Sequence, residues 1–243
     1  MKKSVKSLLF VMAGALVMAG IGMLSSCNPN YGEITNKALT IGAYDAIDVS
    51  NGVDIEMSAD ILAPVLTTNE LIMDKVRVEV ENGTLIIELK DMIYTTKISE
   101  LKVVLPLNPD LKKITASGAS RVEVKGTVPL NELHLSGATT ADIDAVTDIK
   151  KIEMSGLSRA DIDGVGDKVE IDISGGSDLD AQDLLVSEMT GNLSGASFID
   201  VTICTKLAVD ASGASGINYG LVSPTCNPTI DCNLTGGAKI YQR

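Results

Sequence analysis

A row of aspartates at nearly even spacing is the feature of this sequence that could most readily do chemistry. Carboxylates at the separation of adjacent β-strands repel by roughly 1 kcal/mol per pair at the dielectric constant of water. A divalent cation would relieve that repulsion, because Ca²⁺ takes about 6–8 oxygen ligands. Ca²⁺ is therefore the candidate cofactor. Its candidate ligands, about 19 or two residues apart, are Asp142, Asp144, Asp161, Asp163, Asp180 and Asp200.

The alternative is a solvated acidic face with diffuse counter-ions, and two observations favour it. The Gly-rich nonapeptide of calcium-binding solenoids is absent. In addition, Arg121 and Arg159 stand two residues before acidic residues on the same side, where they would partly neutralise the row. We therefore expect no resident metal. The row would be a solvated face instead.

A calcium-dependent polysaccharide lyase is the enzymatic version of the calcium hypothesis. Such an enzyme needs a longer repeat, a groove and a basic residue placed over the sugar. The repeat described below is short, and only 3% of the residues are aromatic. Because a fold does not by itself define a function, these features count against the lyase, and no catalytic residue is assigned.

His134 is the only histidine, and no second histidine or nearby cysteine accompanies it, so a metal site is not expected there. We expect a surface histidine beside acidic side chains. The dipeptide Ser-Gly could also suggest a hydrolase nucleophile, but the flanking pattern of a nucleophile elbow is missing. The repeated occurrence of this dipeptide indicates an architectural role.

Three cysteines follow Cys27, and an exported protein would hold them in an oxidising compartment. Cys226 and Cys232 are the disulfide candidates, because a bridge between them would staple a C-terminal loop. Cys232 also falls at an inward position that would suit a buried thiol, and Cys204 is expected in the core. A Cys204–Cys226 bridge is a further alternative.

The elements that would position these residues follow from a repeat of about 19 residues. A period near 20 indicates a solenoid, and the Leu-x-x-Leu-x-Leu lattice of leucine-rich repeats is absent. Glycine suits a sharp corner in each repeat, because it adopts positive φ without a Cβ clash. Ser-Gly or Thr-Gly pairs, spaced by 19, 19, 19, 20, 18 and 23 residues, begin at Ser117, Ser136, Ser155, Ser174, Ser194, Ser212 and Thr235.

Apolar and polar residues alternate on both sides of each pair, as at Leu133 and Leu135 before Ser136 and at Ala141 and Ile143 after it. This pattern predicts two strands per repeat. Parallel strands connected in this way coil right-handed. The predicted fold is all-β, a right-handed single-stranded parallel β-helix (solenoid) with about 19-residue rungs and an irregular N-terminal capping region. A third short strand is expected near Val146, Val165, Leu185 and Leu207.

The chain is expected to divide into a less regular N-terminal part, residues 44–116, and regular rungs with a C-terminal cap, residues 117–243. Asn51-Gly52 and Asn82-Gly83 stand between alternating segments and indicate turns. The N-terminal part is predicted to form wider rungs or a capping sheet. Such caps cover the edge groups that an end rung would expose.

Residues 1–26 have the layout of a lipoprotein signal peptide, with three lysines, an apolar run and the sequence Leu24-Ser25-Ser26-Cys27. This ending resembles the lipobox that is cleaved before a lipidated cysteine. Cys27 is therefore the predicted lipidation site, and residues 27–43 are predicted to tether the fold to the lipid. The acyl chains would anchor the protein in the outer membrane, facing the periplasm or the cell surface. An ordinary secretory signal with a chance cysteine is the alternative.

The amino-acid composition limits the classes of partner that the chain could bind. The formal net charge is −12, and phosphate backbones repel so acidic a chain, so no nucleic-acid partner is expected. The membrane would be contacted through the lipid anchor. An unidentified protein or glycan would be the partner of the outward faces, and flat β faces also favour a homo-oligomer.

Several segments carry a family resemblance. They are Val-Ser-Asn-Gly-Val-Asp-Ile at 49–55, Val-Glu-Asn-Gly-Thr-Leu-Ile-Ile at 80–87, and the tandem Ser-Gly-Ala-Ser rungs. Over about residues 44–219 the chain resembles the family named "putative auto-transporter adhesin, head GIN domain". The resemblance implies a β-helical fold, a lipoprotein or secreted context and an adhesin role. It brings no catalytic residues. The family is also similar to β-solenoid modules linked to envelope-stress signalling.

Three functions are therefore considered. The first is a non-enzymatic cell-envelope lipoprotein with an adhesin-like β-helical binding module. The second is a periplasmic module for envelope-stress sensing or scaffolding, and the third is the calcium-dependent polysaccharide lyase. Exposure on the cell surface separates the first two functions, and calcium-dependent cleavage of a sugar polymer would support the third.

Overall fold

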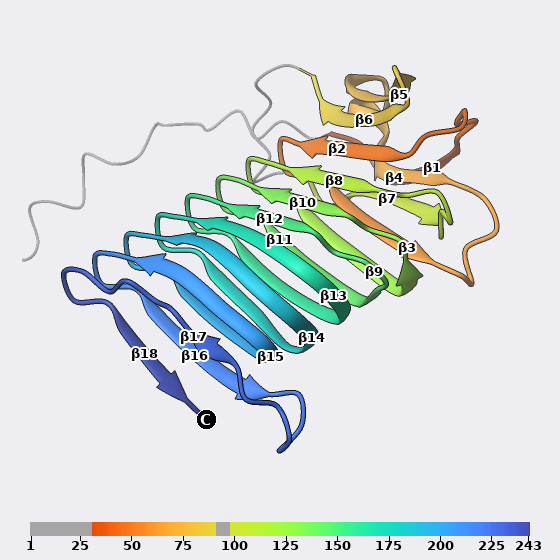
Figure 1. Ribbon diagram of the computed structural model, residues 1–243. Helices are drawn as coiled ribbons and strands as arrows, with labels where there is room; N and C mark the ends of the chain where they lie inside the picture. Colours follow the sequence, from red (N-terminus) through yellow and green to blue (C-terminus); the bar gives the residue numbers. More distant parts are fainter. Residues whose placement is uncertain (1–30, 91–97) are drawn as a thin grey trace, which may run out of the picture. The chain divides into compact units, whose positions relative to one another are not determined.

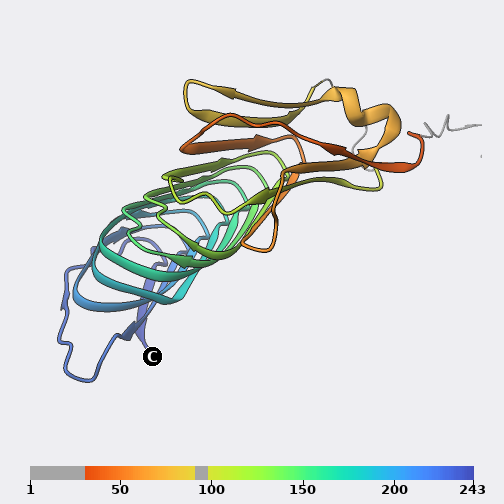
Figure 2. The same cartoon turned by 90° about the vertical axis from the view of Figure 1, so that its right-hand side faces the viewer.

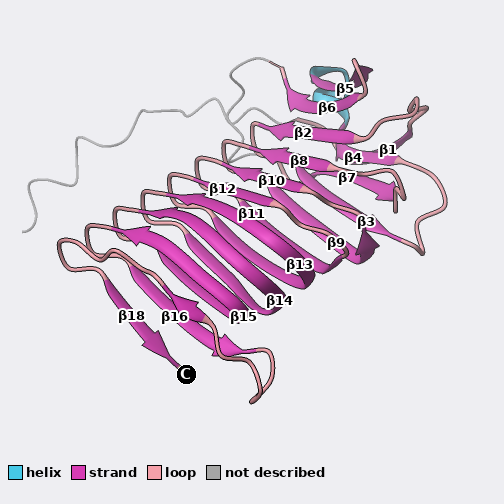
Figure 3. Ribbon diagram, in the orientation of Figure 1, coloured by secondary structure: helices cyan, strands magenta, loops and turns pink. Residues whose placement is uncertain are grey.

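β-Strands make up nearly all of the regular structure in the computed structural model, which describes residues 31–90 and 98–243 (Figures 1 and 3). Within these two ranges, no helix is long and apolar enough to cross a membrane. The N-terminal elements are β1 (Ile34–Ala38), β2 (Ala46–Ser50), β3 (Asp54–Ser58), β4 (Val65–Asn69), the 3₁₀-helix η1 (Glu70–Lys75), β5 (Val76–Glu81), β6 (Thr84–Leu89) and β7 (Leu101–Pro106). The later strands are β8 (Lys113–Ala116), β9 (Arg121–Val128), β10 (Glu132–Leu135), β11 (Thr140–Val146), β12 (Lys151–Met154), β13 (Arg159–Ile173), β14 (Asp178–Leu193), β15 (Phe198–Ala211), β16 (Gly216–Leu221), β17 (Thr229–Ile230) and β18 (Lys239–Gln242).

Successive repeats stack in parallel, and each strand pairs with the strand one repeat away (Figures 1 and 2). Leu133 of β10 lies beside Ile152 of β12, and Ile152 lies beside Ile171 of β13. On the other side of the corner, β9, β11, β13, β14, β15 and β16 pair in the same way. The predicted parallel β-helix with about 19-residue rungs is confirmed.

Each regular rung presents three faces. The first face contains β2, β8, β10, β12 and the ends of β13, β14 and β15. The second face contains β3, β9, β11, the starts of β13, β14 and β15, and β16 and β18. The third face is short and contains the segments in which Val165 pairs with Leu185 and Met189 with Leu207. The repeated Ser-Gly corner joins the first face to the second.

The corner is a column of glycines that hydrogen-bond from rung to rung. Gly137 and Gly156 have φ of 79°, a conformation that only glycine adopts easily. The N–H of Leu157 donates to the carbonyl oxygen of Gly137 at 2.7 Å, and the N–H of Gly176 donates to that of Gly156 at 2.7 Å. These bonds hold adjacent corners so close that no Cβ fits between them. Backbone angle and close approach therefore both require glycine.

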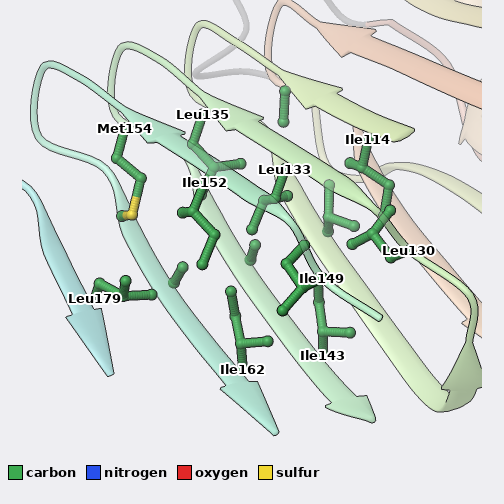
Figure 4. Packing of buried hydrophobic residues seen from close by; sticks show 14 of the residues in the cluster. Ile114, Leu130, Leu133, Leu135, Ile143, Ile149, Ile152, Met154, Ile162 and Leu179 are labelled. Atoms are coloured by element: carbon green, nitrogen blue, oxygen red, sulfur yellow. The ribbon is translucent and has the colours of Figure 1, made fainter. Parts of the chain in front are cut away.

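The core is a single stack of apolar side chains enclosed by the three faces (Figure 4). Ile114, Leu133 and Ile152 point inward from consecutive rungs of the first face, and each is fully buried. Burying a side chain of this size contributes about 1.5–3 kcal/mol, so the repeated inward positions are the main source of stability. The alternation predicted from the sequence is confirmed.

A column of buried hydroxyls follows the corner, and sequence reasoning did not identify it. Each member lies three residues after a corner serine. The hydroxyl of Ser158 donates to the carbonyl oxygen of Ser155 at 2.7 Å, and the hydroxyl of Ser177 donates to that of Ser174 at 2.9 Å. These local bonds satisfy polar groups that would otherwise be costly to bury. The column consists of Ser120, Thr139, Ser158, Ser177, Ser197 and Ser215.

The third strand lies where it was expected, but its side chains do not share one orientation. Val146 and Leu207 are buried, whereas Val165 is 46% exposed and Leu185 is 45% exposed. The register between β13 and β14 shifts between Asp161 and Gly164, where Gly164 has φ of 128°. β11 has one residue more than β13 at this point, so Val146 pairs with Gly164, and Val165 comes one position later and faces outward.

The N-terminal rungs do not stack in sequence order. The rung formed by β2 and β3 lies between β6 and β7 on one side and β8 and β9 on the other. Val49 pairs with Ala116 and Asp54 with Arg121, so Ser50-Asn51-Gly52 is an additional rung corner. Asn51 has φ of 62° at the position where later rungs have glycine. This substitution fits, because Asn tolerates the left-handed region better than most residues.

The predicted N-terminal capping region is a mixed sheet. β5 and β6 form an antiparallel hairpin across Asn82-Gly83, and both turn residues have positive φ, as a type I′ turn requires. β4 pairs antiparallel with β7 and with β1. Residues 34–38, which belong to the segment expected as a tether, form β1. The signal segment and Cys27 lie outside the described residues.

Candidate functional site

The acidic row of the second face is aligned by the parallel register. Asp142 pairs with Asp161, Asp161 with Asp180, and Asp180 with Asp200, so these side chains form one outward column. Glu123 precedes Asp142 in this column, and Glu56 precedes Glu123. We call Glu56, Glu123, Asp142, Asp161, Asp180 and Asp200 the acidic column.

Asp144 and Asp163 lie at bulges beside the acidic column rather than within its register. Among the described residues, no group of three or more His, Cys, Asp or Glu side chains is arranged to hold a metal ion. The candidate Ca²⁺ ligands therefore follow a line of rungs and do not converge on one point. A line of this kind attracts cations without enclosing one.

Basic side chains compensate both ends of the acidic column. Glu56 is bound by Lys102 and by Lys125 at 2.8 Å, and these hydrogen bonds lower the pKa of Glu56 to about 2. Lys125 also lies 3.2 Å from Glu123. At the other end, Nε of Arg243 donates to Asp200 at 2.8 Å. Neutralisation was expected from Arg121 and Arg159. The ion pairs to the column come instead from Lys102, Lys125 and Arg243.

The middle of the acidic column has no ion pairs among the described residues. Asp142, Asp161 and Asp180 form no ion pair with another described residue. Burial raises the pKa of Asp161, and the charges of Asp180 and Asp142 raise it further. Burial also raises the pKa of Asp163, with a further contribution from Asp183. Negative charge is therefore concentrated near the centre of the second face.

Replacing Asp161 or Asp163 with Asn should raise the free energy of unfolding at pH 7 by about 0.5 kcal/mol, a size typical of charge interactions that water screens. Both pKa values are raised above 3.8, so the folded state binds these protons more tightly than the unfolded state. The stability contributed by these protons is complete below about pH 3.8 and is lost as the pH rises through the raised pKa. Urea unfolding at several pH values should show that the gain from Asn shrinks on acidification.

Asp172→Asn is the matched control, because it removes a carboxylate from the first face.

The pKa of Glu56 is shifted in the opposite direction to that of Asp161. Its pKa falls from 4.5 to about 2, so the stability it contributes is present above pH 4.5 and is lost as the pH falls towards 2. Acidification from pH 7 should therefore remove the penalty at Asp161 and Asp163, and acidification below pH 4.5 should remove the contribution of Glu56. A gain from Asp161→Asn that stayed constant with pH would contradict this account.

His134 lies among acidic side chains on the first face. Its Nδ1 is 2.6 Å from Glu153, and its Nε2 is 3.1 Å from Glu132. Lys113 binds Glu132 at 3.1 Å and Lys151 binds Glu153 at 2.6 Å, and these lysines are the main reason that the pKa values of both glutamates are lowered. The charges in this cluster are thus largely paired with one another. His134 therefore links two adjacent rungs through its contact with Glu153.

The structure corrects the cysteine prediction. Cys204 and Cys226 form a disulfide with S–S 2.07 Å, and Cys232 is a free, half-buried thiol. The candidate bridge between Cys226 and Cys232 is therefore wrong, and the alternative bridge is present. Cys204 is half-buried rather than in the core, and the bridge ties the loop before β17 to β15. Burial raises the pKa of the Cys232 thiol.

Two further hollows were not anticipated. One, of about 250 Å³, is mainly apolar and includes Tyr44, Leu105 and Leu107, and burial raises the pKa of Tyr44. The other, of about 260 Å³, lies on the second face around Phe198, Asp180 and Asn218. A phenylalanine at an outward strand position was the only sequence signal for the second hollow.

The described residues thus define a class of protein, a parallel β-solenoid with regular polar outward faces and shallow hollows. The family model described as "Putative auto-transporter adhesin, head GIN domain" matches residues 43–220. The chain therefore belongs to this family, and the resemblance found in its sequence is confirmed. None of the curated proteins matches the sequence.

Three solved structures share the fold, and each alignment covers 87% of this chain and 97% of the other. A protein of Bacteroides fragilis described as a putative adhesin has a TM-score of 0.76 at 16% identity. One of Parabacteroides merdae, also described as a putative adhesin, has a TM-score of 0.65 at 16% identity. One of Parabacteroides distasonis, described as a putative lipid binding protein, has a TM-score of 0.66 at 19% identity. Identities this low establish the common fold alone.

Proposed function

We propose that this chain is a non-enzymatic, adhesin-like binding module anchored to the bacterial outer membrane by lipid on Cys27. The observation that carries the proposal is the regular polar surface of the solenoid. Parallel strands about 4.8 Å apart present rows of side chains on a rigid support, and solenoids use such extended surfaces for binding. Membership of an adhesin-head family supports the same function.

The anchor is proposed from the sequence. Leu24-Ser25-Ser26-Cys27 follows a charged start and an apolar run, and Cys27 lies only a few residues before β1. A short connection of this kind would keep the solenoid near the membrane surface. Several acyl chains on one residue would hold it there firmly, because each buried CH₂ contributes about 0.8 kcal/mol.

Two versions of the function differ in the side of the outer membrane on which the solenoid lies. On the cell surface, the outward faces would meet external partners, as an adhesin requires. In the periplasm, the same faces would serve as a platform for another envelope protein, in stress sensing or scaffolding. The lipid anchor is compatible with both orientations.

The test combines lipid labelling with protease accessibility on intact cells. Radiolabelled palmitate should enter the protein and should be absent from the Cys27→Ser variant, and Cys232→Ser is the matched control that keeps its label. A tag placed after Arg243 should be removed by protease added to intact cells. Removal of the tag only after lysis would move the module to the periplasm and favour the scaffold. Equal labelling of wild type and Cys27→Ser would refute the anchor.

A further inference from the structure

Phe198 is an exposed aromatic ring in a row of polar and small side chains. Phe198 is the first residue of β15, and its side chain is 51% exposed. Burying such a ring would contribute about 1.5–3 kcal/mol to the stability of the fold. Phe198 is also the only phenylalanine in the chain apart from Phe10. Single exposed apolar residues are common, but this ring lines a hollow of about 260 Å³. Aromatic side chains that line a hollow beside a few polar groups are typical of ligand sites.

The next rung leaves room for the ring. Gly216 pairs with Phe198, and a Cβ built on Gly216 would lie 2.6 Å from Cδ1 and 2.7 Å from Cε1 of the ring. One edge of the ring therefore rests over the backbone of Gly216. Side chains occupy the equivalent position in other rungs, for example Arg159 and Asp178. The absence of a side chain at Gly216 fixes where the ring lies.

Polar side chains line the hollow together with the ring of Phe198. Asp180, Gln182 and Asn218 line the same hollow, and together they offer carboxylate oxygens and two amides. The backbone N–H of Gln182 donates to Asp180 at 3.4 Å, which orients this carboxylate. Amides both donate and accept hydrogen bonds, so the hollow can pair with a ligand that does the same.

Most of the negative charge around the hollow is already compensated. Asp178 lies 3.5 Å from Arg159, and Asp200 accepts a hydrogen bond from Arg243 at 2.8 Å. Of the three carboxylates that line the hollow, only Asp180 forms no ion pair with a described residue. Pairing therefore leaves one free carboxylate at the hollow, and this carboxylate can accept hydrogen bonds from an uncharged polar ligand.

We propose that the hollow at Phe198 binds a neutral saccharide. The apolar side of a sugar ring lies on Phe198, and sugar hydroxyls exchange hydrogen bonds with Asp180, Gln182 and Asn218. The inference rests on the proposed binding function and names its ligand class. A site on the flat second face is open along the stack, so an extended oligosaccharide fits better than a single sugar.

The test is a titration of the full chain, purified in detergent, with three neutral probes: cellohexaose, xylohexaose and mannohexaose. We expect at least one probe to bind with millimolar or tighter affinity. Phe198→Ala should weaken that binding by about tenfold, the loss expected for an aromatic contact. Gly216→Ala should weaken it similarly, because the new Cβ displaces the ring without removing it. Asp180→Asn should also weaken it.

Two matched controls separate the site from general surface effects. Leu157→Ala removes a side chain that is 73% exposed outside the hollow, and Asp142→Asn removes a carboxylate of the same column two rungs away. Neither should change the affinity. The probe should be recovered uncleaved with and without CaCl₂, whereas cleavage would indicate the lyase and overturn simple binding.

Failure of all three probes would overturn the inference, as would binding that Phe198→Ala and Gly216→Ala leave unchanged. Tetramethylammonium that bound in place of the sugars would show a cation site, because a cation is also attracted to an aromatic face. These outcomes do not depend on cell-surface exposure. A surface-exposed protein without saccharide affinity would refute only this inference. A wild-type protein without a lipid label and outside the envelope would refute the proposed function.

Discussion

Gly156→Ala should destabilise the protein by about 2–5 kcal/mol, from the combined cost of overpacking and of a left-handed non-glycine residue. Gly156 has φ of 79°, and an added Cβ would lie 2.4 Å from the carbonyl oxygen of Gly137. That oxygen is fixed by its hydrogen bond from Leu157, so the clash cannot be relieved without opening the rungs. Guanidinium unfolding of wild type and variant measures the difference.

Gly176→Ala is the matched control for this substitution. Gly176 lies in the corner of the next rung, at the position that Ala138 occupies two rungs earlier. A Cβ added to Gly176 would lie 3.0 Å from the flexible end of the Leu157 side chain, its nearest contact. Other rungs already have alanine at this position, so the change should cost less than about 1 kcal/mol. Similar losses for the two variants would mean that the close approach at Gly156 does not control stability.

Removing the disulfide, with Cys204→Ser and Cys226→Ser together, should lower the free energy of unfolding by about 3 kcal/mol. The two cysteines are 22 residues apart, so the bridge restricts the unfolded chain over slightly more than one rung. Chemical unfolding in the absence of reductant measures the loss, and dithiothreitol should shift wild type towards the double variant.

Cys232→Ser is the control, because this thiol is free. It should leave the effect of dithiothreitol unchanged. If the double variant were as stable as wild type, the loop before β17 would not depend on the bridge for its attachment to β15. If Cys232→Ser abolished the effect of dithiothreitol, Cys232 would be a bridge partner in solution.

The regular part of the fold was predictable because one local pattern repeats. Each corner of the regular rungs has glycine at positive φ, and each strand has alternating side chains, so Ser136-Gly137 and its neighbours indicate both corner and register. The acidic column followed from the same register, because residues one period apart must become neighbours. Asp142, Asp161, Asp180 and Asp200 were therefore placed correctly relative to one another.

The remaining features depend on distances that the local sequence does not encode. Asn51-Gly52 and Asn82-Gly83 look alike, yet the first is a rung corner and the second a hairpin turn, because different strands are available to pair beside them. The register shift at Gly164 placed Val165 outward, because Gly164 and not Val165 pairs with Val146. The hollow at Phe198 depends on Gly216, which comes from the next rung and is 18 positions away by numbering.

The position of the β2–β3 rung has a consequence for how the chain acquires its structure during synthesis. β2 and β3 are made early, but their hydrogen-bonding partners on both edges, β6 to β9, are made later. Both edges of this rung therefore stay unpaired until the segments up to β9 are available. Addition of rungs strictly in the order of translation is excluded for this end, and non-local pairing of this kind slows folding. The later rungs, in contrast, can be added one at a time onto β9.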